Sequence, residues 1–467
     1  NKQGFFHQSS PGSSRSGGSV RGGGGVRSAF VSCGDGAKFS SSVADLARTE
    51  TLLLLRPLRA LLHLGRDRAD IARLGRSDGS AMKIDPTALD IRTLAPLFTA
   101  FEEAGARLLY VGGCIRNAVM GGAATDIDLT SDAVPDQMRR IAQAHGIRVV
   151  DTGADHGTLT FLLGGKSYEI TTFRQDVTTD GRHAEVVFGT SLEQDAARRD
   201  FTMNALYAEA SGQVIDPLDG LADAQARRLR FIGEPQARIA EDYLRILRFF
   251  RFWAWYGDPL EGVDAQALAA CAALQSGLER ISKERIGAEL LKLLAAADPA
   301  LALATMEAAG ILGHVLPGAS ARSVSLLVDL EREHPPDALR RLACLGGEAV
   351  QERLRLSNVQ ARQVEALRYH GQNTSKALAH GYALGAAQGW SSWLLRAAWM
   401  ENRVTETEQE AVRRGAQSVC PVSAADLMPK YQGPALGEAL KRAQDIWIAR
   451  DMQITKDEIL VHLDGLG

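Results

Sequence analysis

The hydrophobic pattern of the chain changes at Glu234-Pro235, and this change limits what the chain can fold into. Between residues 82 and 233, short apolar runs such as "RLLYV", "GTLTFLL" and "SYEITTF" indicate β-strands, and "DQMRRIAQAHG" has the spacing of a helix. After Pro235 the strand signals stop, and "RIAEDYLRILRFFRFWAWYG" begins a long series of segments with helical spacing. The pattern predicts an α+β fold, in which a sheet domain is followed by an all-α remainder.

Residues 1–81 differ from the rest of the chain. They contain "SSPGSSRSGGSVRGGGGVRS", a Gly/Ser/Arg-rich segment that cannot bury enough apolar surface to offset chain entropy, so we expect disorder. Regular periodicity begins at Met82, which we interpret as the true start, with the leader as upstream translation. An import peptide is the alternative, because no acidic residue precedes Asp35.

Composition excludes several classes of protein. The chain has 467 residues, which predicts two or three domains. Its five cysteines lie far apart without a C-x-x-C motif, which argues against a zinc site or a disulfide framework and favours a cytoplasmic location. No apolar run is long enough to span a bilayer, so we expect no membrane partner.

Asp126 and Asp128 stand one residue apart in "TDIDLTS". On a strand, residues i and i+2 project from the same face, so both carboxylates would point at one spot. They would repel each other unless a cation lay between them, which makes the pair a candidate metal site. The alternative is a polar strand edge or turn, and the pair alone does not decide between them.

The segment before this pair favours a phosphate site. In "VGGCIRNAVMGG" a predicted strand ends at Gly112-Gly113 and a helix carrying Arg116 follows, which offers unhindered N–H groups to an anion. A Gly-Gly turn alone indicates only a turn. The order of strand, Gly-Gly, helix and D-x-D describes nucleotidyl transfer, in which two divalent ions about 3.5–4 Å apart activate a hydroxyl and neutralise the leaving pyrophosphate.

The stretch "DAARRDFTMNAL" suits nucleotide binding. In "DAARRDFTMNAL", Arg198 and Arg199 suit phosphate and Asp200 suits a ribose hydroxyl, with an exposed charged turn as the alternative.

In "EDYLRILRFFRF", Asp242, Arg245 and Arg248 fall every third residue, which predicts one polar stripe on a helix. A carboxylate that accepts and a guanidinium that donates fit the Watson–Crick edges of C and A, and leave unpaired groups against U and G. The alternative is a set of ion pairs on a solvated helix face.

Taken in order, "VGGCIRN", "DIDLT", "RRDFTMNAL", "DPLDG", "EDYLRILRF" and "ISKERIGAELLKLL" resemble the class II tRNA nucleotidyltransferase and bacterial poly(A) polymerase family of the polymerase β superfamily. The likeness runs from about residue 108 to 294. It implies a polymerase β-like nucleotidyltransferase head at 82–233, a helical neck with a nucleobase template at 234–300, and a helical body and tail at 301–467 that bind tRNA.

The resemblance also implies roles for single residues. Asp126 and Asp128 would be catalytic and would hold Mg²⁺, while Asp242 and Arg245 would select CTP and then ATP. Glu284, Arg285 and Glu289 match the last motif, which in the family braces the template helix. The nucleotide-binding residues implied are Gly112, Gly113, Arg116, Arg199, Asp200, Asn204, Asp242, Arg245 and Arg248.

Two features qualify the likeness. The family usually has Arg-Asp where this chain has Arg116-Asn117, which removes a negative charge near the triphosphate but keeps the hydrogen-bonding shape. The stretch "DVTTDGRHAEVVF" resembles the family's mobile loop, and for residues 180–183 within it the resemblance implies no specific role beyond contact with RNA or nucleotide.

The function implied is template-independent addition of CCA to the 3′ end of tRNA from CTP and ATP. An A-adding enzyme or a poly(A) polymerase with the same active site is the closest alternative. The mildly acidic end "DMQITKDEILVHLDGLG" favours tRNA maturation, since bacterial poly(A) polymerases commonly carry a basic tail. A non-catalytic RNA-binding relative would need a broken metal pair, and both aspartates are present.

Overall fold

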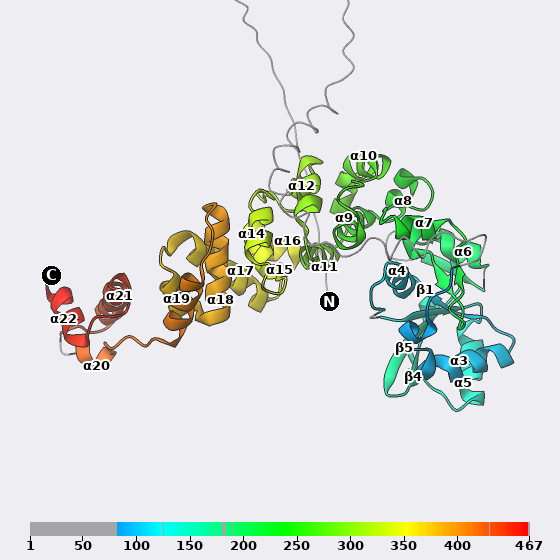
Figure 1. Cartoon of the computed structure of the whole chain (residues 1–467), viewed down its shortest axis with the longest axis horizontal. Coiled ribbons are helices and arrows are strands. Elements are labelled where there is room, and N and C mark those ends of the chain that lie inside the picture. Colours follow the sequence, from blue (N-terminus) through cyan, green and yellow to red (C-terminus); the bar gives the residue numbers. More distant parts are fainter. Residues whose placement is uncertain (1–81, 125, 180–183, 190, 429, 466–467) are drawn as a thin grey trace, which may run out of the picture. The chain divides into compact units, whose positions relative to one another are not determined.

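The computed structural model describes residues 82–124, 126–179, 184–189, 191–428 and 430–465 (Figure 1). The predictions about the leader at 1–81 and about residues 180–183 therefore lie outside the described residues. No helix in these ranges is both long enough and apolar enough to cross a bilayer.

The first part of the described chain forms a mixed sheet. Its strand order is β3-β4-β5-β2-β1-β8-β9, and β2 pairs with β5 in parallel while the other neighbours are antiparallel. A separate hairpin is formed by β6 and β7. The bounds are β1(Leu108–Val111), β2(Asp128–Ser131), β3(Arg148–Gly153), β4(Thr158–Leu163), β5(Lys166–Thr172), β6(Arg174–Thr179), β7(Ala184–Phe188), β8(Tyr207–Ala208) and β9(Val214–Ile215).

Amphipathic helices supply the apolar side chains that this sheet needs. Leu97 and Phe101 of α3 and Met138 of α5 are buried in the same core as Phe161 and Ile170 of the sheet. The rings of Phe101 and Phe161 lie 5.9 Å apart. The helical elements of this part are η3(Pro86–Leu89), α3(Ile91–Glu103), α4(Gly113–Val119), α5(Pro135–Ala144), η4(Ala154–His156), α6(Leu192–Ala197), η5(Thr202–Asn204) and α7(Gly220–Gln225).

Helices make up the rest of the described chain, and no strand follows Ile215 in it. The elements are α8(Pro235–Glu241), α9(Arg245–Tyr256), α10(Ala265–Ala273), η6(Gln275–Arg280), α11(Lys283–Leu294), α12(Ala300–Ala308), α13(Ile311–Val315), α14(Val324–Leu330), α15(Ala338–Leu345), α16(Val350–Leu354), α17(Asn358–Asn373), α18(Ala377–Trp399), α19(Glu406–Gln417), α20(Ala424–Leu427), α21(Pro434–Ala449) and α22(Lys456–Asp464). The predicted α+β fold, a sheet followed by an all-helical part, is confirmed.

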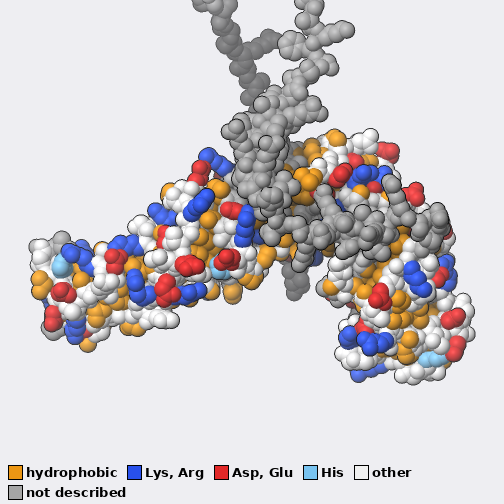
Figure 2. All heavy atoms as spheres, viewed as in Figure 1, with side chains coloured by type: hydrophobic (Ala, Val, Ile, Leu, Met, Phe, Trp, Pro, Cys, Tyr) orange, Lys and Arg blue, Asp and Glu red, His pale blue; other side chains and the backbone are white. Residues whose placement is uncertain are grey.

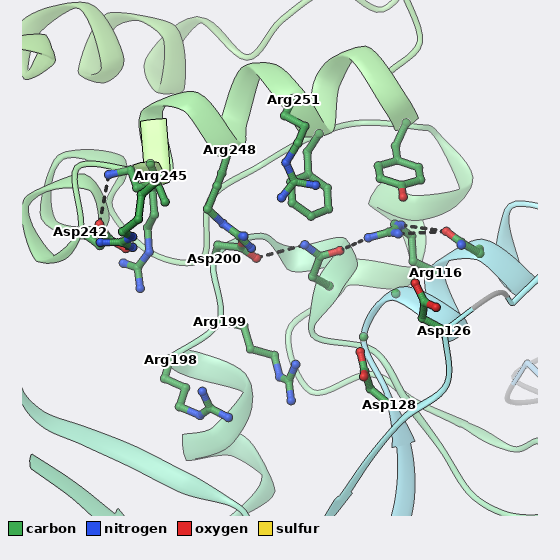
Figure 3. Close-up of a pocket in the computed structure, with 18 residues that line it drawn as sticks. Arg116, Asp126, Asp128, Arg198, Arg199, Asp200, Asp242, Arg245, Arg248 and Arg251 are labelled. Carbon is green, nitrogen blue, oxygen red and sulfur yellow. Dashed lines mark hydrogen bonds and ion pairs between the residues drawn. The ribbon is translucent and has the colours of Figure 1, made fainter. Parts of the chain in front are cut away.

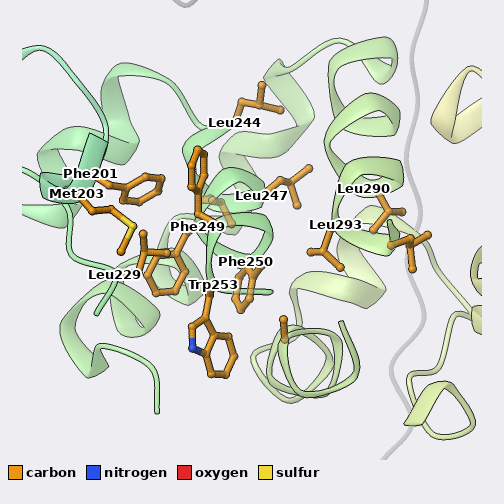
Figure 4. Packing of buried hydrophobic residues seen from close by; sticks show 14 of the residues in the cluster. Phe201, Met203, Leu229, Leu244, Leu247, Phe249, Phe250, Trp253, Leu290 and Leu293 are labelled. Carbon is orange, nitrogen blue, oxygen red and sulfur yellow. The ribbon is translucent and has the colours of Figure 1, made fainter. Parts of the chain in front are cut away.

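Helix α9 is packed between the sheet domain and α11. Figure 4 shows Phe249 of α9 beside Phe201, and Leu247 and Phe250 on the side toward Leu290 and Leu293 of α11. Phe249 is fully buried, and its ring lies 6.4 Å from that of Phe201. Because such dense packing tolerates little displacement, α9 is held in a fixed position relative to both neighbours.

One predicted helix is interrupted. The sequence pattern places Asp242, Arg245 and Arg248 on one continuous helix, but α8 ends at Glu241 and α9 begins only at Arg245. Asp242 has an extended backbone, with φ −150° and ψ 104°, and its Oδ1 accepts a hydrogen bond from the backbone N–H of Leu244 at 3.1 Å. This local bond gives the backbone an alternative to the helix, so the predicted stripe is wrong at Asp242.

Candidate active site

A cavity of about 610 Å³ lies where the sheet domain meets α9 and α11. The structure brings all the predicted site residues to its wall, although the sequence spreads them over more than a hundred positions (Figure 3). From the sheet domain the lining residues are Gly112, Gly113, Arg116, Asn117, Asp126, Asp128, Arg198, Arg199, Asp200 and Asn204. From the helical part they are Asp242, Leu244, Arg245, Arg248, Arg251, Phe252, Tyr256 and Arg285.

The glycine turn depends on the conformational freedom of Gly112. This residue is the N-cap of α4 and has a φ of 76°, a backbone conformation that residues with a Cβ rarely adopt. Its N–H donates to the Leu206 carbonyl at 2.9 Å, which ties the turn to the chain just before β8. The turn therefore brings the start of α4, and with it Arg116, to the cavity.

The two aspartates lie at the start of β2. Asp128 is its first residue, and Asp126 lies two positions earlier in the preceding bend. Both are exposed, and both line the cavity. Although Asp128 as a residue is exposed, the protein around its carboxyl group displaces part of the water, which raises the pKa of Asp128 above its ordinary value. The negative charges of Glu169 and Asp126 raise this pKa further, while Arg199 opposes them. The site therefore concentrates negative charge where the sequence predicted a cation.

Glu169 is an acidic neighbour that the sequence analysis did not identify. It lies on β5, directly opposite Asp128 in the parallel register of β2 and β5. The stretch "SYEITTF" was recognised as a strand, but nothing in it says which strand it pairs with. Only the sheet order places this third carboxylate beside the pair.

The donors at this site fit a hard cation. No group of three or more acidic, histidine or cysteine side chains arranged to hold a metal occurs in the described part of the chain. Mg²⁺ does not require one, since it usually takes one or two carboxylates and completes its shell with water and substrate phosphates. Asp126 and Asp128 supply oxygen ligands of that kind.

Arg198 and Arg199 are both held by Asp195, which is fully buried. The Arg198 Nε donates to Asp195 Oδ1 at 2.8 Å and the Arg199 Nη2 donates to Oδ2 at 3.0 Å. The Tyr207 hydroxyl donates to the same Oδ2 at 2.7 Å. Burial alone would raise the pKa of Asp195, but Arg199 and Arg198 hold it below its usual value. Asp195 is the first residue of the motif "DAARRDFTMNAL", and the sequence predicted no role for it. Its burial and its bonds to Arg198 and Arg199 show that it orients these two arginines.

Asp200 joins the sheet domain to α9. Its Oδ1 accepts from the Phe201 N–H at 2.9 Å and from Asn204 Nδ2 at 3.0 Å, and its Oδ2 accepts from Arg248 Nε at 2.9 Å. Burial alone would raise the pKa of Asp200, but the Arg248 charge and the Asn204 hydrogen bond lower it. Contact of Asp200 with a ribose stays a prediction, and in this structure Asp200 fixes Arg248.

Asp242 and Arg245 reach the cavity although they are not on one helix. Asp242 Oδ2 accepts from Arg285 Nη2 at 2.7 Å. Arg245 Nη1 donates to Glu241 Oε2 at 2.5 Å and to the Arg238 carbonyl at 2.6 Å. Both side chains are thereby fixed, as Figure 3 shows for the Asp242 pair.

Two more residues of α9, Arg251 and Tyr256, line the cavity. Arg251 donates through Nε to Glu289 Oε2 of α11 at 2.6 Å. The Arg116 guanidinium lies over the ring of Tyr256, 3.7 Å from its centre. Arg251 could have been found by continuing the three-residue spacing beyond Arg248, whereas the Arg116–Tyr256 contact joins segments far apart in sequence.

Comparisons with known proteins place these elements in context. Residues 108–230 match the family described as the poly(A) polymerase head domain, and residues 262–322 match the family described as a probable RNA and SrmB-binding site of polymerase A.

Two curated relatives are similar to part of this chain. The human mitochondrial CCA tRNA nucleotidyltransferase 1 is 43% identical over 202 residues, covering 43% of this chain and 46% of that protein. The CCA-adding enzyme of Streptococcus gordonii is 41% identical over 217 residues, covering 46% of this chain and 53% of that enzyme. The chain therefore matches about half the length of these relatives.

Solved structures extend the likeness in fold. The CCA-adding enzyme of Bacillus stearothermophilus in complex with CTP aligns with a TM-score of 0.63 at 27% identity, covering 79% of this chain and 93% of that one. The Thermotoga maritima CCA-adding enzyme complexed with tRNA aligns with a TM-score of 0.56 at 18% identity, covering 86% and 98%, which shows a shared fold.

Proposed function

We propose that this chain belongs to the class II tRNA nucleotidyltransferase and bacterial poly(A) polymerase family and adds CCA to the 3′ end of tRNA from CTP and ATP. The observation that carries the proposal is the single cavity that unites an exposed carboxylate pair with Asp242 and Arg245. The pair suits phosphoryl chemistry, and the Asp/Arg combination suits the hydrogen-bonding edge that cytosine and adenine share.

Asp126 and Asp128 are the proposed catalytic residues, and they would hold Mg²⁺ through their carboxylate oxygens. When bound, the ion supplies activation of the RNA 3′-hydroxyl and neutralisation of charge on the leaving pyrophosphate. Glu169 lies beside Asp128 and adds negative charge at the same edge of the sheet. The proposed family membership supports divalent-metal dependence, and Mg²⁺ is our specific choice.

The arginines of the sheet domain suit the triphosphate. Arg198 and Arg199 are fixed by Asp195 at the cavity wall, and Arg116 lines the same cavity from α4. Preorganised cations of this kind stabilise the charge that develops during phosphoryl transfer without having to reorganise.

Asp242 and Arg245 would read the base. Asp242 would accept from the exocyclic amino group of C or A, and Arg245 would donate to the adjacent ring nitrogen. Their ion pairs with Arg285 and Glu241 hold both side chains in place before a nucleotide binds. A uracil or guanine would present a carbonyl to Asp242 and an N–H to Arg245, leaving groups unpaired.

The remaining predictions concern the whole chain. We propose that the head spans 82–233, the neck 234–300 and the body and tail 301–467, and that the last of these binds tRNA mainly through phosphate contacts. The free cysteines Cys114, Cys271, Cys344 and Cys420 support the cytoplasmic location predicted from the sequence.

The test is an extension assay with the full chain and Mg²⁺. The substrates are a tRNA transcript that ends at the discriminator base and the same transcript ending in CC, with CTP and ATP supplied separately and together. We expect two nucleotides to be added with CTP alone and three with both, followed by a stop. Growth only on the CC-ending transcript would mark an A-adding enzyme, and long A tails on unrelated RNA would mark a poly(A) polymerase.

A further inference from the structure

The arginines that line the cavity fall into two classes. All of them except Arg116 form an ion pair with a carboxylate in the described part of the chain. The pairs are Arg198 and Arg199 with Asp195, Arg245 with Glu241, Arg248 with Asp200, Arg251 with Glu289, and Arg285 with Asp242. Arg116 thus differs from the other cavity arginines in the kind of group that holds it.

Neutral groups hold Arg116 on three sides. Its Nε and Nη2 donate to Asn117 Oδ1 at 3.2 and 2.9 Å, and its Nη1 donates to Asn204 Oδ1. Its guanidinium lies over the Tyr256 ring, 3.7 Å from the centre. The side-chain amide of Asn117 is itself oriented by a 3.4 Å bond from Nδ2 to the Ala123 carbonyl. Asn204 in turn donates through Nδ2 to Asp200 Oδ1 at 3.0 Å, and the dashed lines between Arg116 and Asp200 in Figure 3 mark this chain of bonds.

Arg116 therefore carries a buried charge that no bonded carboxylate balances. Only 4% of the residue is exposed, and burial lowers the pKa of its guanidinium. The nearby carboxylate, Asp200, is already bonded to Arg248. An amide oxygen accepts the same hydrogen bonds as a carboxylate oxygen but leaves the cation's charge intact. The free charge is available to an anion in the cavity.

We propose that Asn117 is a positioning residue that fixes the Arg116 guanidinium without neutralising it, and so sets how strongly the cavity prefers nucleoside triphosphates over less charged nucleotides. The inference rests on the proposed function, because it assumes that the anion is the triphosphate of CTP or ATP.

The test measures binding rather than turnover. We would determine the dissociation constants of ATP, AMP and adenosine by calorimetry, with Mg²⁺ present, for the wild-type chain and the Asn117→Asp variant. Asp keeps the size and acceptor geometry of Asn but adds a negative charge beside Arg116. We expect ATP to bind about tenfold more weakly, AMP to be affected less and adenosine to be unchanged.

Thermal unfolding separates this effect from damage to the fold. Since Asn117→Asp gives the buried guanidinium a charged partner, its Tm should equal or exceed that of the wild-type chain. Asn117→Ala removes the acceptor without adding charge, so it should lower Tm and weaken ATP binding by less than Asn117→Asp does. Asn402→Asp makes the same charge change at an exposed residue of the helical part and should alter neither measurement.

Each outcome bears on one claim. ATP affinity of Asn117→Asp equal to or above that of the wild-type chain would overturn the inference. A parallel loss of ATP and adenosine binding, or a lower Tm, would overturn it too, because it would indicate general disruption. Failure of the wild-type chain itself to bind ATP or CTP would instead count against the proposed function.

Discussion

Two sets of charged residues in the cavity, one from the head and one from the neck, differ in whether protein groups balance their charges. Three residues on the head side, Arg116, Asp126 and Asp128, form no ion pair among the described residues, and we call these three the head wall. Arg198, Arg199 and Asp200 line the same side but are paired with protein groups. The neck wall, defined by Asp242, Arg245, Arg248 and Arg251, is paired with protein groups at every position.

This contrast indicates a division of labour. Unpaired charges raise the free energy of the empty site and are relieved by a charged ligand, which suits a metal ion and a triphosphate. Paired charges hold their donors and acceptors in fixed directions with little net field, which suits recognition of a neutral base. Changes on the head wall should therefore alter catalysis, and changes on the neck wall should alter stability and nucleotide choice.

The largest effect is expected on the head wall. Asp126→Ala should reduce incorporation of both CTP and ATP by about a thousandfold or more, because it removes a ligand of the proposed metal site. Binding of tRNA, measured by filter retention, should stay within about twofold because no tRNA phosphate is expected to contact a carboxylate. Turnover close to that of the wild-type chain would mean that the pair is only a polar strand end.

Loss of an ion pair that holds the neck wall should lower the stability of the fold rather than remove catalysis. Glu289→Gln leaves the mostly buried Arg251 without its carboxylate, and should lower the free energy of unfolding by about 3 kcal/mol. The exposed Lys283–Glu352 pair also involves α11, and Glu352→Gln should have a much smaller effect because solvent screens this pair. Urea unfolding of the two variants makes the comparison, and equal losses would show that burial does not set the strength of these ion pairs.

The smallest effect concerns the stability of the head wall. The pKa of Asp128 is raised in the folded chain from its ordinary 3.8, so ionisation of this carboxyl disfavours the folded state at neutral pH. The penalty is absent below the ordinary carboxyl pKa and grows as pH rises through the raised value. Asp128→Asn should therefore stabilise the metal-free chain at pH 7, by less than about 1 kcal/mol because the residue is exposed, and not at pH 3.

Unfolding in EDTA at the two pH values checks this prediction. A stabilisation of equal size at both would show that the carboxylate charge is not its cause. Added Mg²⁺ should stabilise the wild-type chain but not the variant. This result would link the destabilisation of the metal-free chain to Asp128 as a proposed Mg²⁺ ligand.

Sequence patterns predicted the local elements better than their partners. The glycine turn, the D-x-D pair and the arginines of "RRDF" were found because each is a short motif with its own chemistry. Glu169 and Asp195 were missed as site residues because their positions depend on a strand register and on burial, which arise only from long-range pairing.

The break at Asp242 was missed for another reason. Asp242, Arg245 and Arg248 fit a helical repeat, and α9 does bury Ile246, Leu247 and Phe250 as expected. The repeat cannot show that the Asp242 side chain bonds to the backbone of Leu244 and ends the repeat there. Local competition for backbone hydrogen bonds, rather than hydrophobic pattern, decided the outcome.

The most direct test of the division of labour is the nucleotide preference of Asp242→Ala. Single-turnover kcat/KM values for CTP and UTP would be measured on a tRNA that ends at the discriminator base. We predict that the CTP/UTP ratio falls by about tenfold or more, because the variant loses the acceptor that favours cytosine, while the maximal rate with CTP changes far less. An unchanged ratio, with both nucleotides slowed equally, would contradict it and make the neck wall merely structural.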